Sequence, residues 1–351
     1  MQWPADVREE TTMRLARDSI ATRAWRNLQS AAWWRLWLLC LLMGVAAPAV
    51  HAEYPERPIR LVVGFPPGGG GDLYGRQIAD QMSRTLGQPV VVENKGGASG
   101  MMAAEQVAHS KPDGYTLLMG MSSNMSLAAA LRGKELPYRV PEDFVAIGMV
   151  VQAPHGLFAA ADRYGTAKAA LADARVRQLS YGSSGPGSVG YVTMEMIKAK
   201  AGVEIAPIPY RGSGPAITDL LGGHTDLFFA TAPPIMGQVK SGKLKLLALT
   251  GEQRTPAFPD VPTFRELGID VTVTQWYGLV APAGTPDAIV QKLSRAISAG
   301  LRDASLRRVV RQDGAREVDL PTDKFRQYIL DDIARYRAGI TKDLLATMEV
   351  K

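Results

Sequence analysis

Short apolar, β-branched runs alternate with longer segments of helical periodicity along most of the chain after residue 53. The apolar runs predict strands at 59–65, 89–93, 115–119, 178–181, 205–209, 226–230 and 244–250. The segments between them predict helices at 72–86, 99–109, 188–201, 215–221 and 234–239. This alternation is typical of α/β proteins, so we expect mainly parallel sheets with helices on both faces.

Two longer extended runs interrupt this rhythm, FVAIGMVVQAPHGLFAAA at 144–161 and VTVTQWYGLVA at 271–281. Strands of this length can pass from one domain to another. We therefore expect a discontinuous first domain, built from 53–154 and 272–351, and a second domain at 155–271. The last 65 residues look helical, most strongly at 286–301 and 323–345.

The N-terminal region, residues 1–52, has the pattern of a secretory signal with a polar extension before it. An apolar segment at 36–49 follows several arginines and leads into small residues that end at Ala52. This pattern favours a cleaved signal peptide over a membrane anchor, because the apolar segment is short for a membrane span. The single cysteine, Cys40, lies inside this segment. The secreted chain is therefore expected to contain no disulfide or thiolate site.

Glycine and small hydroxyl residues gather at two places where a predicted strand ends and a helix begins. These are FPPGGGGD at 65–72 and YGSSGPGS at 181–188. Free backbone N–H groups and the positive end of a helix make such a junction suitable for an anion. Asp72 suits the N-cap of its helix, and the first motif lacks the lysine of a P-loop. A dinucleotide fingerprint at 185–190 is only a weak match, since its acidic partner, Glu204, begins a strand rather than ending one.

No catalytic or metal-binding pattern stands out. The histidines after residue 52 are far apart, no paired carboxylates stand out, and the formal net charge of +6 is scattered rather than clustered. These features argue against a hydrolase, a metal site and a nucleic-acid surface. Ser122, Ser123 and Asn124 follow the strand at 115–119. They suit either hydrogen bonds to a ligand or a capped turn.

Many segments together resemble one family, the periplasmic solute receptors of tripartite tricarboxylate transporters, also called the Bug family. They include YPERPIRLVVGFPPGGGGD, PVVVENKGGASG, KPDGYTLL, YGSSGPGS, YRGSGPAITDLLGG, GKLKLLALT, PDVPT and WYGLVAPAGTP, in this order. The resemblance covers essentially the whole chain after residue 52. One departure is Ala128-Ala129-Ala130, where relatives usually carry Asn-Pro, and it weakens any substrate carried over for that wall of the site.

The resemblance implies a two-domain periplasmic binding protein fold of type II (Venus flytrap) with two crossover strands. It implies that the loops 66–72 and 181–188 face each other and bind a carboxylate, partly through backbone amides and water. The implied ligand-binding residues are Pro67, Gly68, Gly69, Gly70, Asp72, Ser122, Ser123, Asn124, Tyr181, Ser183, Ser184, Gly185, Gly187, Ser188, Tyr210, Gly212 and Thr231.

The function that follows is that of a periplasmic, monomeric receptor without cofactor, metal or catalytic residues. It would present a small carboxylate to a tripartite transporter. Two alternatives stay open: delivery of the carboxylate to a sensor, and, least favoured, a periplasmic enzyme that acts on a carboxylate.

Overall fold

The computed structural model describes residues 53–340. The predicted signal peptide and the part of the predicted helix 323–345 beyond residue 340 lie outside the described residues. Within 53–340, no helix is both long and apolar enough to cross a bilayer. The ten strands of this part of the chain follow the order β2-β1-β3-β9-β4-β7-β5-β6, with β8 and β10 also pairing with β4.

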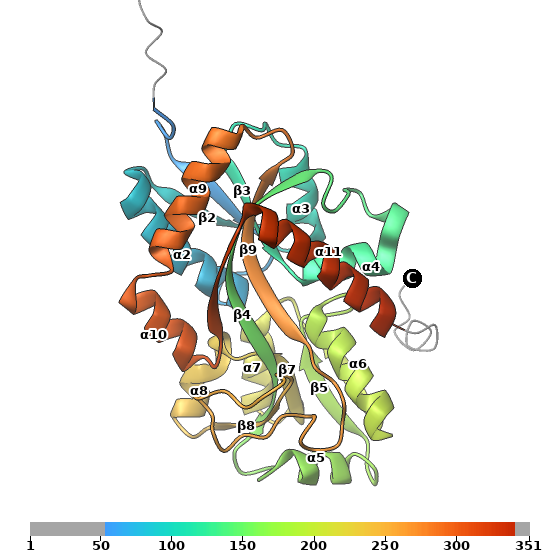
Figure 1. Ribbon diagram of the computed structural model, residues 1–351. Helices are drawn as coiled ribbons and strands as arrows, with labels where there is room; N and C mark the ends of the chain where they lie inside the picture. The colour runs from blue at the N-terminus through green and yellow to red at the C-terminus, as the bar shows by residue number, and fades with distance from the viewer. Residues whose placement is uncertain (1–52, 341–351) are drawn as a thin grey trace, which may run out of the picture. The chain divides into compact units, whose positions relative to one another are not determined.

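The first lobe is built on the strands at the two ends of the described chain (Figure 1). Parallel β1 (Ile59–Val63) lies between β2 (Val90–Asn94) and β3 (Thr116–Met121). Next come the antiparallel strands β9 (Thr274–Pro282), β4 (Phe144–Ala160) and β10 (Arg316–Pro321). This order places β3 beside the crossover strand β9.

The second lobe contains the middle of the chain. Its parallel strands are β6 (Ile205–Pro209), β5 (Leu179–Ser183) and β7 (Leu227–Thr231). The end of β4 joins them by antiparallel pairing with β7 and with β8 (Leu244–Leu249). Because β4 pairs with β9 up to Pro154 and with β7 from His155 onward, one continuous strand joins the two lobes.

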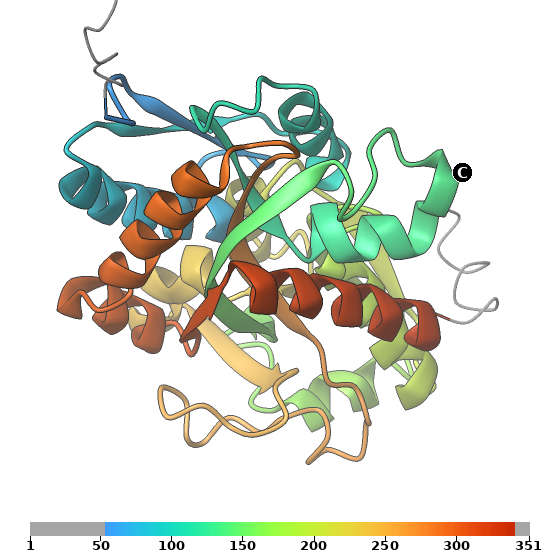
Figure 2. The same cartoon turned by 45° about the horizontal axis from the view of Figure 1, so that its top comes forward.

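Helices cover both faces of each sheet, as predicted. In the first lobe, α2 (Gly70–Leu86), α9 (Asp287–Gly300) and α10 (Ala304–Gln312) pack on one face, and α3 (Met101–Ala108), the short α4 (Ala128–Arg132) and α11 (Thr322–Gly339) on the other. In the second lobe, α5 (Ala167–Asp173) and α6 (Val189–Ala201) lie opposite α7 (Ser213–Leu221) and α8 (Met236–Lys240). Helix α11 runs across the region where β4 and β9 join the lobes (Figure 2).

Two predictions about this architecture are wrong. Parallel pairing is confined to the outer strands, because the crossover strands β4 and β9 run in opposite directions and make the centre antiparallel. The C-terminal region is also not wholly helical, since β10 separates α10 from α11. Strand β10 has the polar sequence REVDLP and is mostly half-exposed or exposed, so it lacks the apolar run that marks the other strands.

The centre of the first lobe depends on close approach between sheet and helix. Gly278 of β9 lies opposite Gly120 of β3. A Cβ atom added at Gly278 would come within 2.4 Å of Phe325 of α11 and 2.9 Å of the Gly148 carbonyl oxygen. Phe325 in turn packs edge-on against Trp276, with ring centroids 5.3 Å apart. The glycine therefore lets α11 lie close to the crossover strand.

We expect Gly278→Ala to lower the free energy of unfolding by about 1–3 kcal/mol, because the added methyl group overpacks a closed core. Gly237→Ala is the matched control, since Gly237 is an exposed residue of α8 and its added Cβ would meet nothing within 4 Å. The control should be neutral or stabilising by up to about 1 kcal/mol. Urea unfolding measures both variants, and equal stabilities would show that Gly278 is not needed for this packing.

Candidate functional site

A small cavity lies between the lobes, with a volume of about 60 Å³. Its walls come from the start of α2, the end of β3 and the start of β9 in the first lobe, and from β4, β7, α6 and α7. The lining residues are Phe65, Pro66, Gly69, Gly70, Gly71, Met121, Ser123, His155, Ser184, Ser188, Val189, Gly190, Gly212, Ser213, Phe229, Ala230, Thr231, Gln275 and Tyr277. None of these described residues is a lysine, arginine, aspartate or glutamate, so the wall carries no side chain of fixed charge.

Three helices begin at the wall of this cavity. Helix α2 starts at Gly70, α6 at Val189 and α7 at Ser213, and all three residues line the cavity. The first N–H groups of a helix lack intrahelical acceptors, and the N-terminus carries a partial positive charge. In α2, the first N–H that donates to the preceding turn is that of Leu73, to Gly69 O at 2.9 Å. The N–H groups of Gly70 and Gly71 have no acceptor within residues 53–340, so they remain available to an anion.

The four glycines of FPPGGGGD differ in whether, and why, the structure requires glycine at their positions. Gly68 has φ +83°, a conformation that disfavours residues with side chains. A Cβ at Gly70 would lie 2.6 Å from Tyr277 Oη, and one at Gly71 would lie 2.8 Å from Met121 Sδ. Gly69, by contrast, is the N-cap of α2 in an ordinary extended conformation. The absence of side chains at these two positions therefore lets the start of α2 pack closely against Tyr277 and Met121, which line the cavity.

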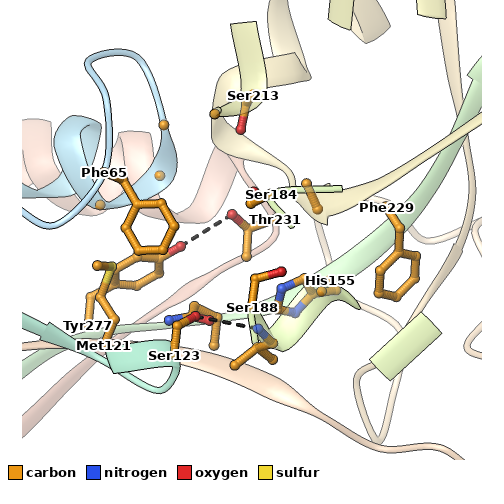
Figure 3. Close-up of a pocket in the computed structure, with 18 of the residues that line it drawn as sticks. Phe65, Met121, Ser123, His155, Ser184, Ser188, Ser213, Phe229, Thr231 and Tyr277 are labelled. Carbon is orange, nitrogen blue, oxygen red and sulfur yellow. Dashed lines mark hydrogen bonds between the residues drawn. The ribbon is translucent and has the colours of Figure 1, made fainter. Parts of the chain in front are cut away.

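Hydrogen bonds join the lobes around the cavity (Figure 3). Thr231 Oγ1 of the second lobe lies 3.2 Å from Tyr277 Oη of the first. The Val189 N–H, at the start of α6, donates to Ser123 Oγ at 3.4 Å. Farther out, Ser99 Oγ donates to the Pro186 carbonyl oxygen at 2.9 Å. The structure therefore shows the two lobes in contact around the cavity.

The structure brings some of the predicted ligand-binding residues to the cavity. Those that line it are Gly69, Gly70, Ser123, Ser184, Ser188, Gly212 and Thr231. Those that do not line it are Pro67, Gly68, Asp72, Ser122, Asn124, Tyr181, Ser183, Gly185, Gly187 and Tyr210. Several of the second group form internal hydrogen bonds that shape the loops around the cavity.

The predicted N-cap role of Asp72 is wrong, because the N-cap is Gly69 and Asp72 lies in the first turn. Its buried carboxylate accepts hydrogen bonds from the Gly68 N–H at 2.9 Å and from Asn94 Nδ2 at 2.9 Å. It also pairs with Arg76 at 2.8 Å. Burial opposes ionisation of Asp72, but these contacts outweigh it and lower the pKa of the carboxyl. Asp72 thus holds the glycine loop in place at Gly68 without lining the cavity itself.

The polar residues after β3 also have internal partners. Ser122 Oγ accepts from the Trp276 N–H at 2.9 Å, and Asn124 Oδ1 accepts from the Met121 N–H at 2.8 Å. In the second lobe, Tyr181 Oη donates to Glu195 at 2.9 Å. Tyr210 Oη likewise donates to Asp219, at 2.7 Å. These hydroxyl and amide groups hold strand ends and neighbouring helices in place.

Sequence reasoning missed several cavity residues in the crossover strands, namely His155 of β4 and Gln275 and Tyr277 of β9. His155 is only 4 % exposed and stacks on Phe229, with ring centroids 5.7 Å apart. Burial lowers the pKa of the His155 imidazole to about 3, so the ring is neutral near pH 7. The alternation of side chains between the two faces of a strand could have predicted these positions only if the partner strands of β4, which change from β9 to β7, were known.

The low pKa of His155 makes acid stability a test of its burial. In the unfolded chain the pKa returns to about 6.5, so the unfolded state binds more protons as the pH falls below that value. Stability due to the neutral ring is therefore present above pH 6.5 and is lost as the pH falls toward 3. His155→Leu should flatten the fall in unfolding free energy by up to about 1 kcal/mol per pH unit. Parallel curves for wild type and variant, from urea unfolding between pH 7 and 4.5, would contradict the buried neutral ring.

Comparison with known proteins shows which family the chain belongs to. A family model described as "Tripartite tricarboxylate transporter family receptor" matches residues 74–345. Protein BugT of Bordetella pertussis is 34% identical over 310 residues, which cover 87% of this chain and 95% of BugT.

Solved structures give the same result. The periplasmic binding protein BugD superposes with a TM-score of 0.78 at 34% identity, over 83% of this chain and 98% of BugD. MatC from Rhodopseudomonas palustris, solved with bound malate, gives a TM-score of 0.76 at 32% identity, over 82% of this chain and 100% of MatC. R. palustris Rpa4515, solved with adipate, gives 0.77 at 31% identity, over 82% of this chain and 97% of that protein. The chain therefore belongs to the tripartite tricarboxylate transporter receptor family and has the periplasmic binding protein fold of its solved relatives.

Proposed function

We propose that this protein is a periplasmic receptor that binds a small carboxylate in the cavity between its lobes. The observation that carries the proposal is the meeting of three helix N-termini, those of α2, α6 and α7, at a cavity wall without a fixed charge. Such ends offer unpaired N–H groups and partial positive charge to an anion. The relatives solved with malate and with adipate support the same ligand class.

The proposed contacts follow from the lining. The backbone at Gly69, Gly70 and Gly212 and the hydroxyl of Ser184 can donate to ligand oxygens. Ser123 Oγ accepts from the Val189 N–H, so its hydroxyl can also donate to a ligand without losing that bond. Ser188 can donate after giving up its bond to the Gly185 carbonyl oxygen, and Thr231 can donate after giving up Tyr277. The predicted residues that do not line the cavity act through the loops that they hold.

We propose the domain boundaries 53–154 with 272–351 for the first lobe and 155–271 for the second. The exchange of partners in β4 between Pro154 and His155 supports this division. A ligand that touches both lobes favours the closed arrangement, because it binds that arrangement more tightly than the open one. The hydrogen bond between Thr231 and Tyr277 would then be part of the closed state.

The closed receptor would be recognised by the membrane subunits of a tripartite transporter, after cleavage of the signal peptide within residues 1–52. We propose that it acts as a monomer and without catalysis, since its family and solved relatives are receptors. Delivery of the carboxylate to a sensor would use the same site. An enzyme would need a nucleophile or an acid–base pair, and the residues that line the cavity offer His155 without a charged partner.

Gly70→Ala tests the proposed site. The added Cβ would press on Tyr277 Oη at 2.6 Å and Thr231 Oγ1 at 3.0 Å, at the start of α2. Overpacking of this kind costs about 1–3 kcal/mol, so we expect carboxylate affinity to fall about tenfold or more. Calorimetric titration with malate and with adipate measures the loss, and circular dichroism checks the fold.

Gly214→Ala is the control, because this exposed residue of α7 is outside the cavity lining and its added Cβ would meet nothing within 4 Å. It should bind as the wild type does. Wild-type affinity in the Gly70 variant would place the carboxylate outside the cavity. Absence of binding by the wild type across malate, adipate and other small carboxylates would argue against a carboxylate receptor.

A further inference from the structure

The surroundings of His155 leave a polar group unused by the fold. Its backbone is held firmly, since its N–H donates to Thr250 Oγ1 and its carbonyl accepts from the Thr250 N–H, both at 2.9 Å. The ring, however, has no hydrogen-bond partner among residues 53–340, and its Nδ1 is completely buried. A buried polar group without a partner costs about 1–3 kcal/mol. Such a group calls for a reason other than stability.

The position of the ring points to the cavity. His155 lines it together with Phe229, on which the ring stacks, and Thr231, its neighbour across the strand pair (Figure 3). Gly190, near the start of α6, lies against the Cδ2–Nε2 edge of the ring. A Cβ added there would be 3.4 Å from Cδ2 and 3.6 Å from Nε2. Because Gly190 has no side chain, residue 190 places no further atoms against this edge of the imidazole.

The chemistry of the ring limits what it can recognise. A neutral imidazole has one N–H donor and one acceptor nitrogen, so it can bond to a hydroxyl, a carbonyl or a carboxyl group. Tyr277 is the only other titratable residue that lines the cavity in the described chain. No charged side chain from β4, β7, α6 or β9 therefore competes there for the imidazole.

We infer that His155 recognises a second polar group of the bound carboxylate and so determines specificity. The inference rests on the proposed carboxylate site. With one carboxylate at the helix N-termini, the imidazole would bond to a hydroxyl, oxo or second carboxyl group on the same ligand. The receptor would thus select bifunctional carboxylates over unsubstituted acids of the same chain length.

The test compares acids of equal length in calorimetry, malate with butyrate and adipate with hexanoate. Wild type should prefer the bifunctional acid by about tenfold or more, the value of one good hydrogen bond. His155→Leu should reduce this preference to within about threefold, mainly through weaker binding of malate or adipate. Thr193→Val is the matched control. Thr193 Oγ1 is another buried group without a partner, and Thr193 does not line the cavity, so the control should keep the preference.

Thermal unfolding at pH 7.5 separates ligand recognition from a structural role. Loss of an unpaired buried group should leave the melting temperature of His155→Leu unchanged or raise it. A clear fall would mean that the ring serves the fold and would overturn the inference. So would a preference that persists in the variant, or a wild type that favours butyrate or hexanoate. Absence of binding by the wild type to all four acids would instead overturn the proposed function, and this inference with it.

Discussion

The proposed function depends on the meeting of three helix N-termini at a cavity whose lining, within the described chain, has no lysine or arginine. Helices α2, α6 and α7 belong to different strand–helix units, yet their first residues line one space of about 60 Å³. The N–H groups of Gly70 and Gly71 point out of the hydrogen-bonding pattern of α2 and have no protein acceptor within residues 53–340. Partial charges from helix ends can replace a lysine or arginine at such a place.

The cavity is lined by helix N-termini from both lobes. Helix α2 belongs to the first lobe and α6 and α7 to the second, so the site is complete only when the lobes meet. Strand β4 joins the lobes, because it pairs with β9 up to Pro154 and with β7 from His155 onward. The contact between the lobes is made by small groups, such as the hydroxyls of Thr231 and Tyr277. Glycine at position 70 leaves room for them.

Local sequence patterns were sufficient for most of the fold and for the glycine junctions. Apolar strands and helix starts depend on patterns among neighbouring residues, so these elements, and α6 with its N-cap at Ser188, could be predicted. Strand β10 could not, since its polar sequence is a strand only by pairing with β4. The cavity roles of His155 and Tyr277 depend on contacts between distant segments. Asp72, which suits a cap by residue type, instead holds the loop before its helix.

A crystal structure of the protein with malate, or with adipate if it binds more tightly, tests the central claim most directly. The account predicts a ligand carboxylate at the N-termini of α2, α6 and α7, with an oxygen bonded to the N–H of Gly70 or Gly71 directly or through one water. A carboxylate paired with a lysine or arginine outside this cavity, with the helix N-termini unoccupied, would contradict it.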